Sequence, residues 1–177
     1  MIETLNGPTL ETTRLNLRPL AADDAPRMAA LANDFDVARM TAVMPFPYAL
    51  GDAERFIARV LARPPGGHAT FAVEPDQGGL AGVIGFHPGD GLGPEIGYWL
   101  GRPYWSLGYA TEALRACLAW AVAERNVRCV TAGHFTDNPA SGRVLEKAGF
   151  LPTGRIEPSP CAARGEPALS RKMVWLA

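Results

Sequence analysis

Residues 103–121 read PYWSLGYATEALRACLAWA, a short loop with Ser106 and Gly108 that runs directly into a helix with one apolar face. Backbone N–H groups at a helix start have no intrahelical partner, and the helix dipole adds partial positive charge there. The N–H groups of residues 107–111 therefore suit an anion with many acceptor oxygens, such as a pyrophosphate. Gly108 allows close backbone approach, and the small Ala110 leaves room for a ligand. The alternative is an ordinary loop-to-helix junction, because glycine before a helix is common.

The composition favours a domain with a full core and argues against a nucleic-acid partner. The chain has 177 residues, with 17 basic and 18 acidic side chains and a net charge of −1. A chain of this length forms roughly one domain, so we expect a single domain over residues 1–177. Nucleic-acid binders carry a marked basic surplus, which this sequence lacks.

The cysteines and histidines give no sign of a disulfide or a metal site. The three cysteines form no CxxC pair, and the three histidines are scattered along the chain. This pattern favours a reducing, cytoplasmic setting without a bound metal. The N-terminal residues lack a basic segment followed by an apolar run, and no stretch reaches the ~18 apolar residues of a membrane span. We therefore expect a soluble protein that is not exported and has no membrane partner.

Apolar periodicity predicts alternating strands and helices. The run RLNLR predicts a first strand over residues 14–18, and Asp23 and Asp24 precede a predicted helix over residues 25–32. Apolar residues at helical spacing predict a second helix over residues 52–63. The remaining predictions are strands at 69–74, 80–86, 95–100 and 127–135, helices from 109 to about 124 and from 138 to about 148, and final strands after residue 150. This order fits a mixed central sheet covered by helices on both faces.

Four segments of the chain carry the motifs of a known family. They read ETTRLNLRPLAADD, LGDAERFIARVL, PEIGYWLGRPYWSLGYATEAL and TDNPASGRVLEKAGF, and they follow one another in the family's order. Together they resemble the GNAT superfamily of acyl-CoA-dependent N-acyltransferases, and within it the RimJ/RimL-like branch of ribosomal-protein N-terminal acetyltransferases. The resemblance implies an α/β (α+β) GNAT fold with a mixed, mostly antiparallel sheet, splayed parallel strands and helices on both faces.

The resemblance also implies that acetyl-CoA binds along the loop and the strand before it. Residues 105–110 match the family's phosphate-loop pattern, except that Trp105 replaces a basic or glutamine residue; Arg102 would supply that charge. Pantetheine would pair with main-chain groups of strand 95–100, in the gap to strand 127–135. The implied contacts to acetyl-CoA are Tyr98, Trp99, Leu100, Arg102, Trp105, Ser106, Leu107, Gly108, Tyr109, Ala110, Thr111, Asn138, Ser141 and Arg143.

Acetyl transfer to an amine needs a base for the amine and a proton for the departing thiolate. By resemblance, Glu95 aligns with a glutamate that serves as general base in some relatives. The tyrosine acid of many relatives would fall near Leu145, so the resemblance gives this role to Ser141 and a pantetheine contact to Asn138. Each residue also has a purely structural interpretation. Glu95 would be a carboxylate at the end of a strand, and Asn138 and Ser141 would cap the start of a helix. Arg143 faces either the cofactor phosphates or solvent.

The resemblance implies a direct transfer to an amine, with Phe46 and Tyr48 contacting the acceptor because relatives close the site at this loop. No cysteine lies in a catalytic motif, which favours transfer without a covalent enzyme intermediate. The acceptor is either a protein α-amine or a small-molecule amine, and a homodimer is compatible with the family. The alternatives are an inactive CoA-binding sensor or scaffold, and a transferase for a larger acyl group.

Overall fold

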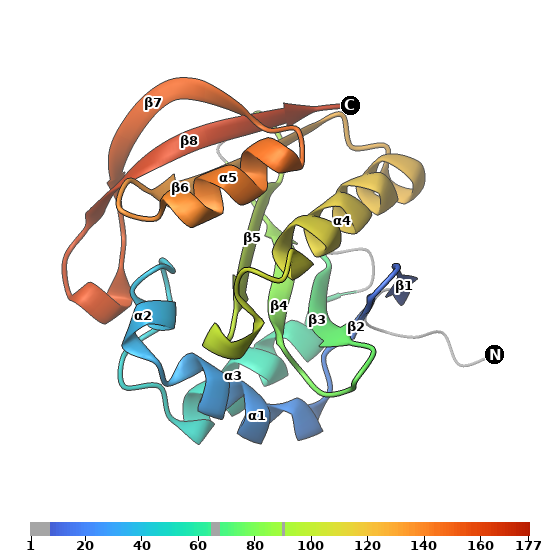
Figure 1. Ribbon diagram of the computed structural model, residues 1–177, viewed down its shortest axis with the longest axis vertical. Coiled ribbons are helices and arrows are strands. Elements are labelled where there is room, and N and C mark those ends of the chain that lie inside the picture. The colour runs from blue at the N-terminus through green and yellow to red at the C-terminus, as the bar shows by residue number, and fades with distance from the viewer. Residues whose placement is uncertain (1–7, 65–67, 90) are drawn as a thin grey trace.

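The chain folds around a mixed sheet in a computed structural model that describes residues 8–64, 68–89 and 91–177 (Figure 1). Within these ranges the sheet has eight strands in the order β1-β2-β3-β4-β5-β6-β8-β7. Neighbouring strands are antiparallel, except that β5 and β6 run parallel. The strands are β1 (Leu10–Glu11), β2 (Leu15–Pro19), β3 (Thr70–Pro75), β4 (Gly82–His87), β5 (Glu95–Leu100), β6 (Cys129–Phe135), β7 (Leu151–Ser159) and β8 (Ala168–Leu176).

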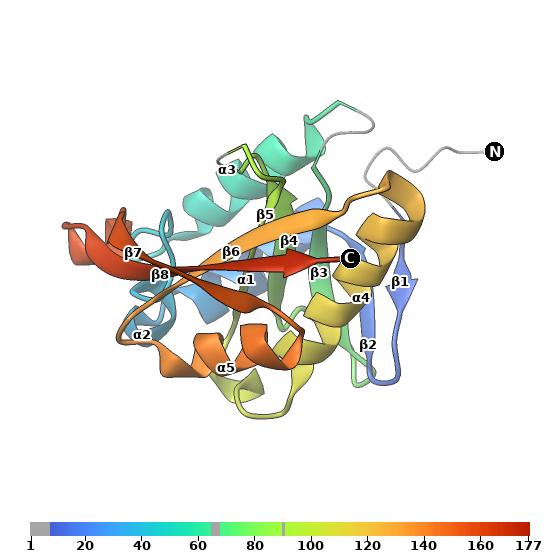
Figure 2. The ribbon, with the colours of Figure 1, turned by 90° about the horizontal axis from the view of Figure 1, so that it is seen from above.

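Helices cover both faces of the sheet. One apolar cluster joins α4 and α5 to the sheet, and a second joins α1, α2 and α3 to the opposite face (Figure 2). The helices are α1 (Ala25–Ala32), α2 (Phe35–Ala38), α3 (Leu50–Leu61), α4 (Tyr109–Arg125) and α5 (Pro139–Lys147), with short 3-10 turns η1 (Ala22–Asp24), η2 (Arg102–Tyr104) and η3 (Ala162–Arg164). The predicted mixed sheet between two helical layers is confirmed.

Strand β3 contributes to both layers because its side chains alternate. Phe71 and Val73 point into the cluster with α4 and α5, whereas Ala72 points into the cluster with α1, α2 and α3. Successive side chains of a strand point to opposite faces, so a strand covered on both sides is apolar without interruption. This double packing holds the central strands rigidly beneath the loops that join them to the helices.

Helix α4, which follows the predicted phosphate-binding loop, is bounded by two residues in the left-handed conformation. Gly108 (φ 84°) precedes it and Asn126 (φ 51°) follows it. Glycine adopts positive φ without strain, and asparagine tolerates it better than most residues. Leu114 and Leu118 are buried beneath the helix. Packing of this face fixes where the N-terminus of α4, and the loop before it, lie.

Most predicted elements are confirmed, with boundaries shifted by one or two residues. The helix predicted over residues 52–63 is α3, which begins earlier because the Asp52 carboxylate accepts a hydrogen bond from the N–H of Ala49 and closes the first turn. The elements β1 and α2 were not predicted, since they are too short to show a period. No helix in the described ranges is long and apolar enough to cross a membrane. The expectation about a leader segment concerns residues 1–7, which lie outside the described residues.

Candidate active site

The parallel strands β5 and β6 part after one paired position. Glu95 on β5 lies opposite Thr131 on β6, and the N–H of Thr131 donates to the carbonyl of Pro94 at 2.9 Å. No other position of β6 pairs with β5 in the described chain. The opposite edge of β5 pairs with β4 over its full length. The predicted gap between the parallel strands is therefore present, and Glu95 lies where it begins.

The backbone of Tyr98 and Leu100 faces this gap. The N–H of Gly101 donates to Ala81, next to β4, at 2.9 Å, and the backbone groups of alternate strand residues point to opposite edges. Residues 98 and 100 therefore direct their N–H and C=O groups toward β6, where an extended chain can add as a strand. The carbonyl of Leu100 already accepts a hydrogen bond from the indole Nε1 of Trp105 at 2.7 Å. The Trp99 side chain packs against the cluster with α1, α2 and α3.

The loop before α4 has the geometry of an anion-binding nest. Ser106 (φ 62°) and Gly108 (φ 84°) both have positive φ, on either side of the exposed Leu107. The N–H of Glu112 donates to the carbonyl of Gly108 at 3.1 Å, in the first turn of α4. The amides of residues 109–111 precede this bond and have no i−4 carbonyl within the helix. Positive φ and free helical amides together fit a pyrophosphate group.

A salt bridge that the sequence reasoning missed braces this loop from behind. Arg14, just before β2, donates from Nη1 to the carbonyl of Leu107 at 2.9 Å and from Nε to Glu112 at 2.8 Å. The Glu112 carboxylate also accepts from the hydroxyl of Thr12 at 2.7 Å and from the N–H of Arg14 at 2.8 Å. Burial opposes ionisation of Glu112, but these hydrogen bonds hold its pKa below the usual value. The carboxylate is thereby neutralised and does not repel an anion at the loop.

The structure places the predicted charge donor Arg102 beside two aspartates. Its guanidinium contacts Asp34 at 2.7 and 2.8 Å and Asp36 at 2.6 Å, and its Cζ lies over the Trp105 ring, 5.4 Å from the centroid. The hydrogen bonds that the guanidinium donates to these carboxylates raise the pKa of Arg102 above its usual value. Its charge is therefore already paired, and Trp105 is held between the guanidinium and the carbonyl of Leu100.

The gap brings Tyr98 of β5 and Ser141 of α5 together. The Tyr98 Oη lies 2.8 Å from the Ser141 Oγ and 3.3 Å from the Ser141 carbonyl oxygen. Burial raises the pKa of Tyr98 to about 12, although the hydrogen bond to Ser141 opposes the shift. Asn138 caps α5 by accepting from the N–H of Ser141 at 3.1 Å, while Arg143 is exposed further along the helix. Two hydroxyls thus meet beside the open edge of β5.

We expect the substitution Tyr98→Phe to lower kcat by about 3- to 10-fold, the range of one neutral hydrogen bond, and to leave the KM for acetyl-CoA unchanged. The phenol contacts the Ser141 hydroxyl, so we expect its removal to affect proton donation by Ser141 more than the binding of acetyl-CoA. Steady-state kinetics of Tyr98→Phe, Ser141→Ala and the double variant test this. Substitutions at two residues that act together have non-additive effects. If the loss of kcat in the double variant equals the product of the two single losses, the expectation is contradicted.

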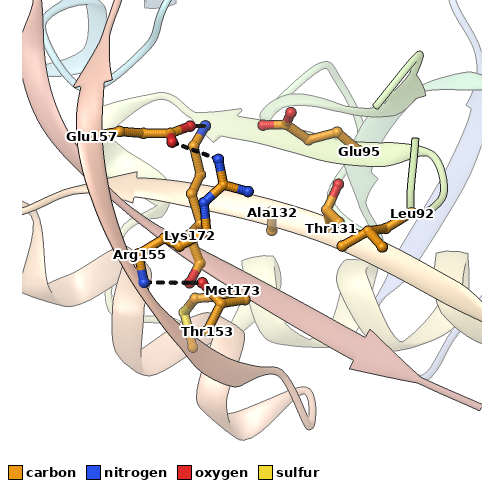
Figure 3. A pocket seen from close by; sticks show the side chains of 9 residues that line it. All are labelled: Leu92, Glu95, Thr131, Ala132, Thr153, Arg155, Glu157, Lys172 and Met173. Carbon is orange, nitrogen blue, oxygen red and sulfur yellow. Dashed lines mark hydrogen bonds and ion pairs between the residues drawn. The ribbon is translucent and has the colours of Figure 1, made fainter. Parts of the chain in front are cut away.

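A hollow of about 140 Å³ opens beside Glu95 and is lined by residues of β5, β6, β8 and β7 (Figure 3). No hydrogen bond or ion pair holds the carboxylate of Glu95 within the described part of the chain. Farther along, Glu157 forms ion pairs with Arg155 at 2.8 Å and Lys172 at 3.6 Å. The lining residues are Leu92, Glu95, Thr131, Ala132, Thr153, Arg155, Glu157, Lys172 and Met173. The volume is ample for several waters or a small polar group.

The two aromatic residues predicted to contact the acceptor lie in different surroundings. Tyr48 is 7% exposed, its hydroxyl points at the sulfur of Met28, and its N–H donates to Asn33 at 3.0 Å. Its side chain belongs to the core beneath α1 and α3. Phe46 is 42% exposed and forms an edge-to-face contact with Phe35 at 5.3 Å. Of the two, Phe46 is the one whose ring is accessible from solvent.

A chain of alternating charges, here called the ion-pair ladder, links the two halves of the splayed sheet. Arg102 pairs with Asp36 at 2.6 Å, Asp36 with Arg39 at 2.9 Å, Arg39 with Asp137 at 3.5 Å, and Asp137 with Arg164 at 2.9 Å. The ladder runs from the turn before the phosphate loop, through α2, to the start of α5 and the β7–β8 connection (Figure 1). The ladder therefore links the turn before the phosphate loop, on one side of the gap, to α5 and the β7–β8 connection on the other side.

The ladder makes the stability of the protein sensitive to acid. Hydrogen bonds from Arg102 hold the pKa of Asp36 below its usual value, and those from Arg164 do the same for Asp137. Carboxyls with a lowered folded-state pKa stabilise the fold above their unfolded pKa of about 4, and this contribution is lost as the pH falls through the folded-state value. We expect Asp137→Asn to lower Tm by about 1 to 4 °C at pH 7. Thermal melts should show this difference shrinking below about pH 4, whereas a constant difference would contradict the expectation.

Comparison with known proteins identifies the family. Residues 14–151 match a family model described as an acetyltransferase (GNAT) domain. The uncharacterized N-acetyltransferase YoaA of Bacillus subtilis (strain 168) is 30% identical over 152 residues, which cover 83% of this chain and 85% of YoaA. The residues that match the family model include the phosphate loop, β5 and β6, and α5.

Solved structures share the fold at lower identity. The ribosomal α-N-protein acetyltransferase RimL in complex with coenzyme A has a TM-score of 0.83 at 18% identity, covering 96% of this chain and 98% of RimL. The spermidine N-acetyltransferase of Vibrio cholerae in complex with CoA and spermine has a TM-score of 0.75 at 18% identity, covering 93% and 96%. Within the described residues, no group of three or more His, Cys, Asp or Glu side chains is arranged to hold a metal. The family match over most of the sequence shows that the chain belongs to the acetyltransferase (GNAT) family and is an acyltransferase that uses acetyl-CoA.

Proposed function

We propose that the protein transfers an acetyl group directly from acetyl-CoA to a primary amine within a ternary complex. The observation that carries this proposal is the single pairing of β5 with β6 at Glu95 and Thr131. The open edge of β5 and the phosphate loop lie beyond that pairing, while the hollow lined by Glu95 lies beside it. A donor in the gap and an amine in the hollow would thus meet where the strands part.

The donor side rests on main-chain groups. The amides of residues 107–110 would hold the pyrophosphate, with the hydroxyls of Ser106 and Thr111 beside them. The N–H and C=O groups of Tyr98 would pair with the pantetheine arm, and Asn138 and Arg143, at the start of α5 and within it, would contact the cofactor from the other side. Acetyl-CoA supplies an activated thioester, and these residues orient it without forming a bond to it.

The reaction forms a C–N bond to the amine and breaks the C–S bond of the thioester. Glu95 would accept the proton that the amine loses, directly or through water. Ser141, positioned by Tyr98, would donate a proton to the departing sulfur. A thiolate is a weak base, so this second proton transfer contributes less than the first.

The identity of the amine is the finer part of the proposal. RimL acts on a ribosomal protein and the Vibrio enzyme on spermidine, although their folds are similar, and fold does not determine substrate. Phe46 is exposed and contacts Phe35, and it is our candidate for acceptor contact. A protein α-amine and a small-molecule amine both fit the proposed chemistry.

The proposal is tested by initial-rate kinetics of thiol release with acetyl-CoA and a panel of primary amines, followed by mass spectrometry of protein and products. Direct transfer predicts intersecting double-reciprocal plots, one acetyl group on the amine and none on the enzyme. Parallel plots with an acetylated enzyme would overturn direct transfer. Binding of acetyl-CoA without release by any amine would favour a CoA-binding sensor, and faster release from succinyl-CoA would favour a larger acyl group.

A further inference from the structure

A row of polar side chains crosses the sheet face that carries the hollow. Glu95 is in register with Thr131, Lys172 with Gly133, and Glu157 with Ser170. Residues that pair across neighbouring strands have side chains on the same face of the sheet, and so do residues two positions apart along one strand. These polar side chains therefore all lie on one face. The neighbouring positions Ala132 and Met173 point instead into the cluster with α4 and α5. Glu95, Thr131, Lys172 and Glu157 therefore form one row, which we call the polar row.

The polar row lies on a part of the sheet that the helices do not cover. The cluster with α1, α2 and α3 includes Ala72 of β3 and Val83 of β4, but no residue of β6, β7 or β8 in the described chain. The row is consequently open to a ligand rather than sealed beneath a helix. Its charged groups surround the same hollow (Figure 3).

The row contains charges of opposite sign on either side of Thr131. At one end the Glu95 carboxylate has no ion-pair partner among the described residues. Beyond Thr131, the Lys172 side chain is 24% exposed and shares Glu157 with Arg155; its Nζ lies 3.6 Å from Glu157, which is longer than a hydrogen bond. An ammonium has three donors, and no hydrogen bond in the described chain uses those of Lys172. The row therefore offers an acceptor at Glu95 and, across Thr131, ammonium donors of Lys172 that no described hydrogen bond uses.

We infer that the acceptor is an amine that also carries a carboxylate, with its nitrogen at Glu95 and its carboxylate toward Lys172. Glu95 and Lys172 both line the hollow of about 140 Å³. A small ligand in this hollow can therefore contact both side chains. The size of the hollow suits an amine and a carboxylate a few bonds apart, as in a free amino acid or an acidic N-terminal residue. The inference rests on the proposed function, because it assigns the acceptor of that reaction.

Two matched pairs of acceptors test the inference. The first pair is an amino acid and its α-amide, and the second is a peptide that begins with glutamate and the same peptide beginning with glutamine. Each pair differs in one carboxylate while the amine is retained. The pair that shows a preference identifies whether the carboxylate comes from the amino-acid backbone or from an N-terminal side chain. Initial rates give kcat/KM for each acceptor with the wild-type protein and with Lys172→Met, Lys172→Arg and Lys147→Met.

We expect the carboxylate-bearing member of one pair to have a kcat/KM at least about tenfold higher, the scale of a charge-assisted hydrogen bond. Lys172→Met should abolish this preference by lowering kcat/KM for the carboxylate-bearing acceptor, and the remaining acetylation of the amide shows that the variant is folded. Lys172→Arg should keep most of the preference. Lys147→Met should keep all of it, since Lys147 is exposed on α5, away from the hollow.

Equal kcat/KM values within both pairs would overturn the inference, and so would a preference that survives Lys172→Met. In either case the amines would still be acetylated, and the proposed function would stand. If acetyl-CoA binds and no acceptor is acetylated, the proposed function fails and the inference fails with it.

Discussion

The substitution Glu95→Gln is expected to lower kcat/KM for the amine about 100- to 1000-fold, within the range for loss of a general base. Glutamine keeps the size of the side chain but cannot accept a proton from the attacking amine. The affinity for acetyl-CoA should be unchanged, because the phosphate loop and the edge of β5 are not altered. Steady-state kinetics with calorimetric titration of acetyl-CoA measure both quantities.

The matched control is Glu146→Gln, which makes the same chemical change at an exposed position of α5. It should retain wild-type kinetics. If Glu95→Gln lowers kcat/KM by less than about threefold, the loss is well below the usual contribution of a general base. That result would show that Glu95 is only a strand-end carboxylate. Solvent or another group would then take the proton.

The substitution Gly108→Val is expected to weaken acetyl-CoA binding by about 10- to 100-fold. Gly108 has a φ of 84°, and a Cβ there would lie 3.2 Å from the Nη2 of Arg14. A β-branched residue in the left-handed region costs roughly 1–2 kcal/mol or more, so the loop would shift to relieve it. The shift would turn the amides of residues 107–110 away from the pyrophosphate. Calorimetric titration with acetyl-CoA measures the loss.

The control for the backbone strain itself is Gly78→Val in the β3–β4 hairpin. Gly78 has a φ of 83°, and nothing lies within 4 Å of a Cβ built there. Both variants should lose stability, but only Gly108→Val should lose affinity. If Gly78→Val weakens binding as much as Gly108→Val, the effect is global and does not come from the phosphate loop.

The local parts of the fold and site could be predicted from the sequence because their signals lie in short segments. The phosphate loop combines a glycine, small residues and the start of an amphipathic helix within a few positions. The strand EIGYWL is also contiguous, and its observed bounds, Glu95–Leu100, coincide with the prediction. In both cases, neighbouring residues determine the conformation, so periodicity and glycine placement suffice.

The contacts that brace the site could not be predicted, because their partners are distant in sequence. Arg14 and Glu112 are separated by 98 positions, and Tyr98 and Ser141 by 43. Each residue taken alone has an ordinary alternative, such as an exposed arginine or a buried core tyrosine. Only the folded sheet, which brings β2 beside α4 and β5 beside α5, reveals the pairing.

The placement of Tyr48 illustrates a different limit of sequence reasoning. An aromatic residue in a loop suggests a ligand contact, but burial depends on the helices that pack over the loop. Here α1 and α3 enclose the Tyr48 side chain, and burial raises its pKa. Phe46, two residues earlier, remains exposed. The loop sequence contains no periodic signal that would separate the two.

The most direct test of acetyl transfer at this site is calorimetric titration of the full chain with acetyl-CoA, followed by a free-thiol assay with primary amines in the same sample. We predict binding with a dissociation constant on the order of micromolar, as is common for enzyme substrates, and thiol release that requires an amine. Failure to bind acetyl-CoA would contradict the assignment of the phosphate loop and of the gap between β5 and β6.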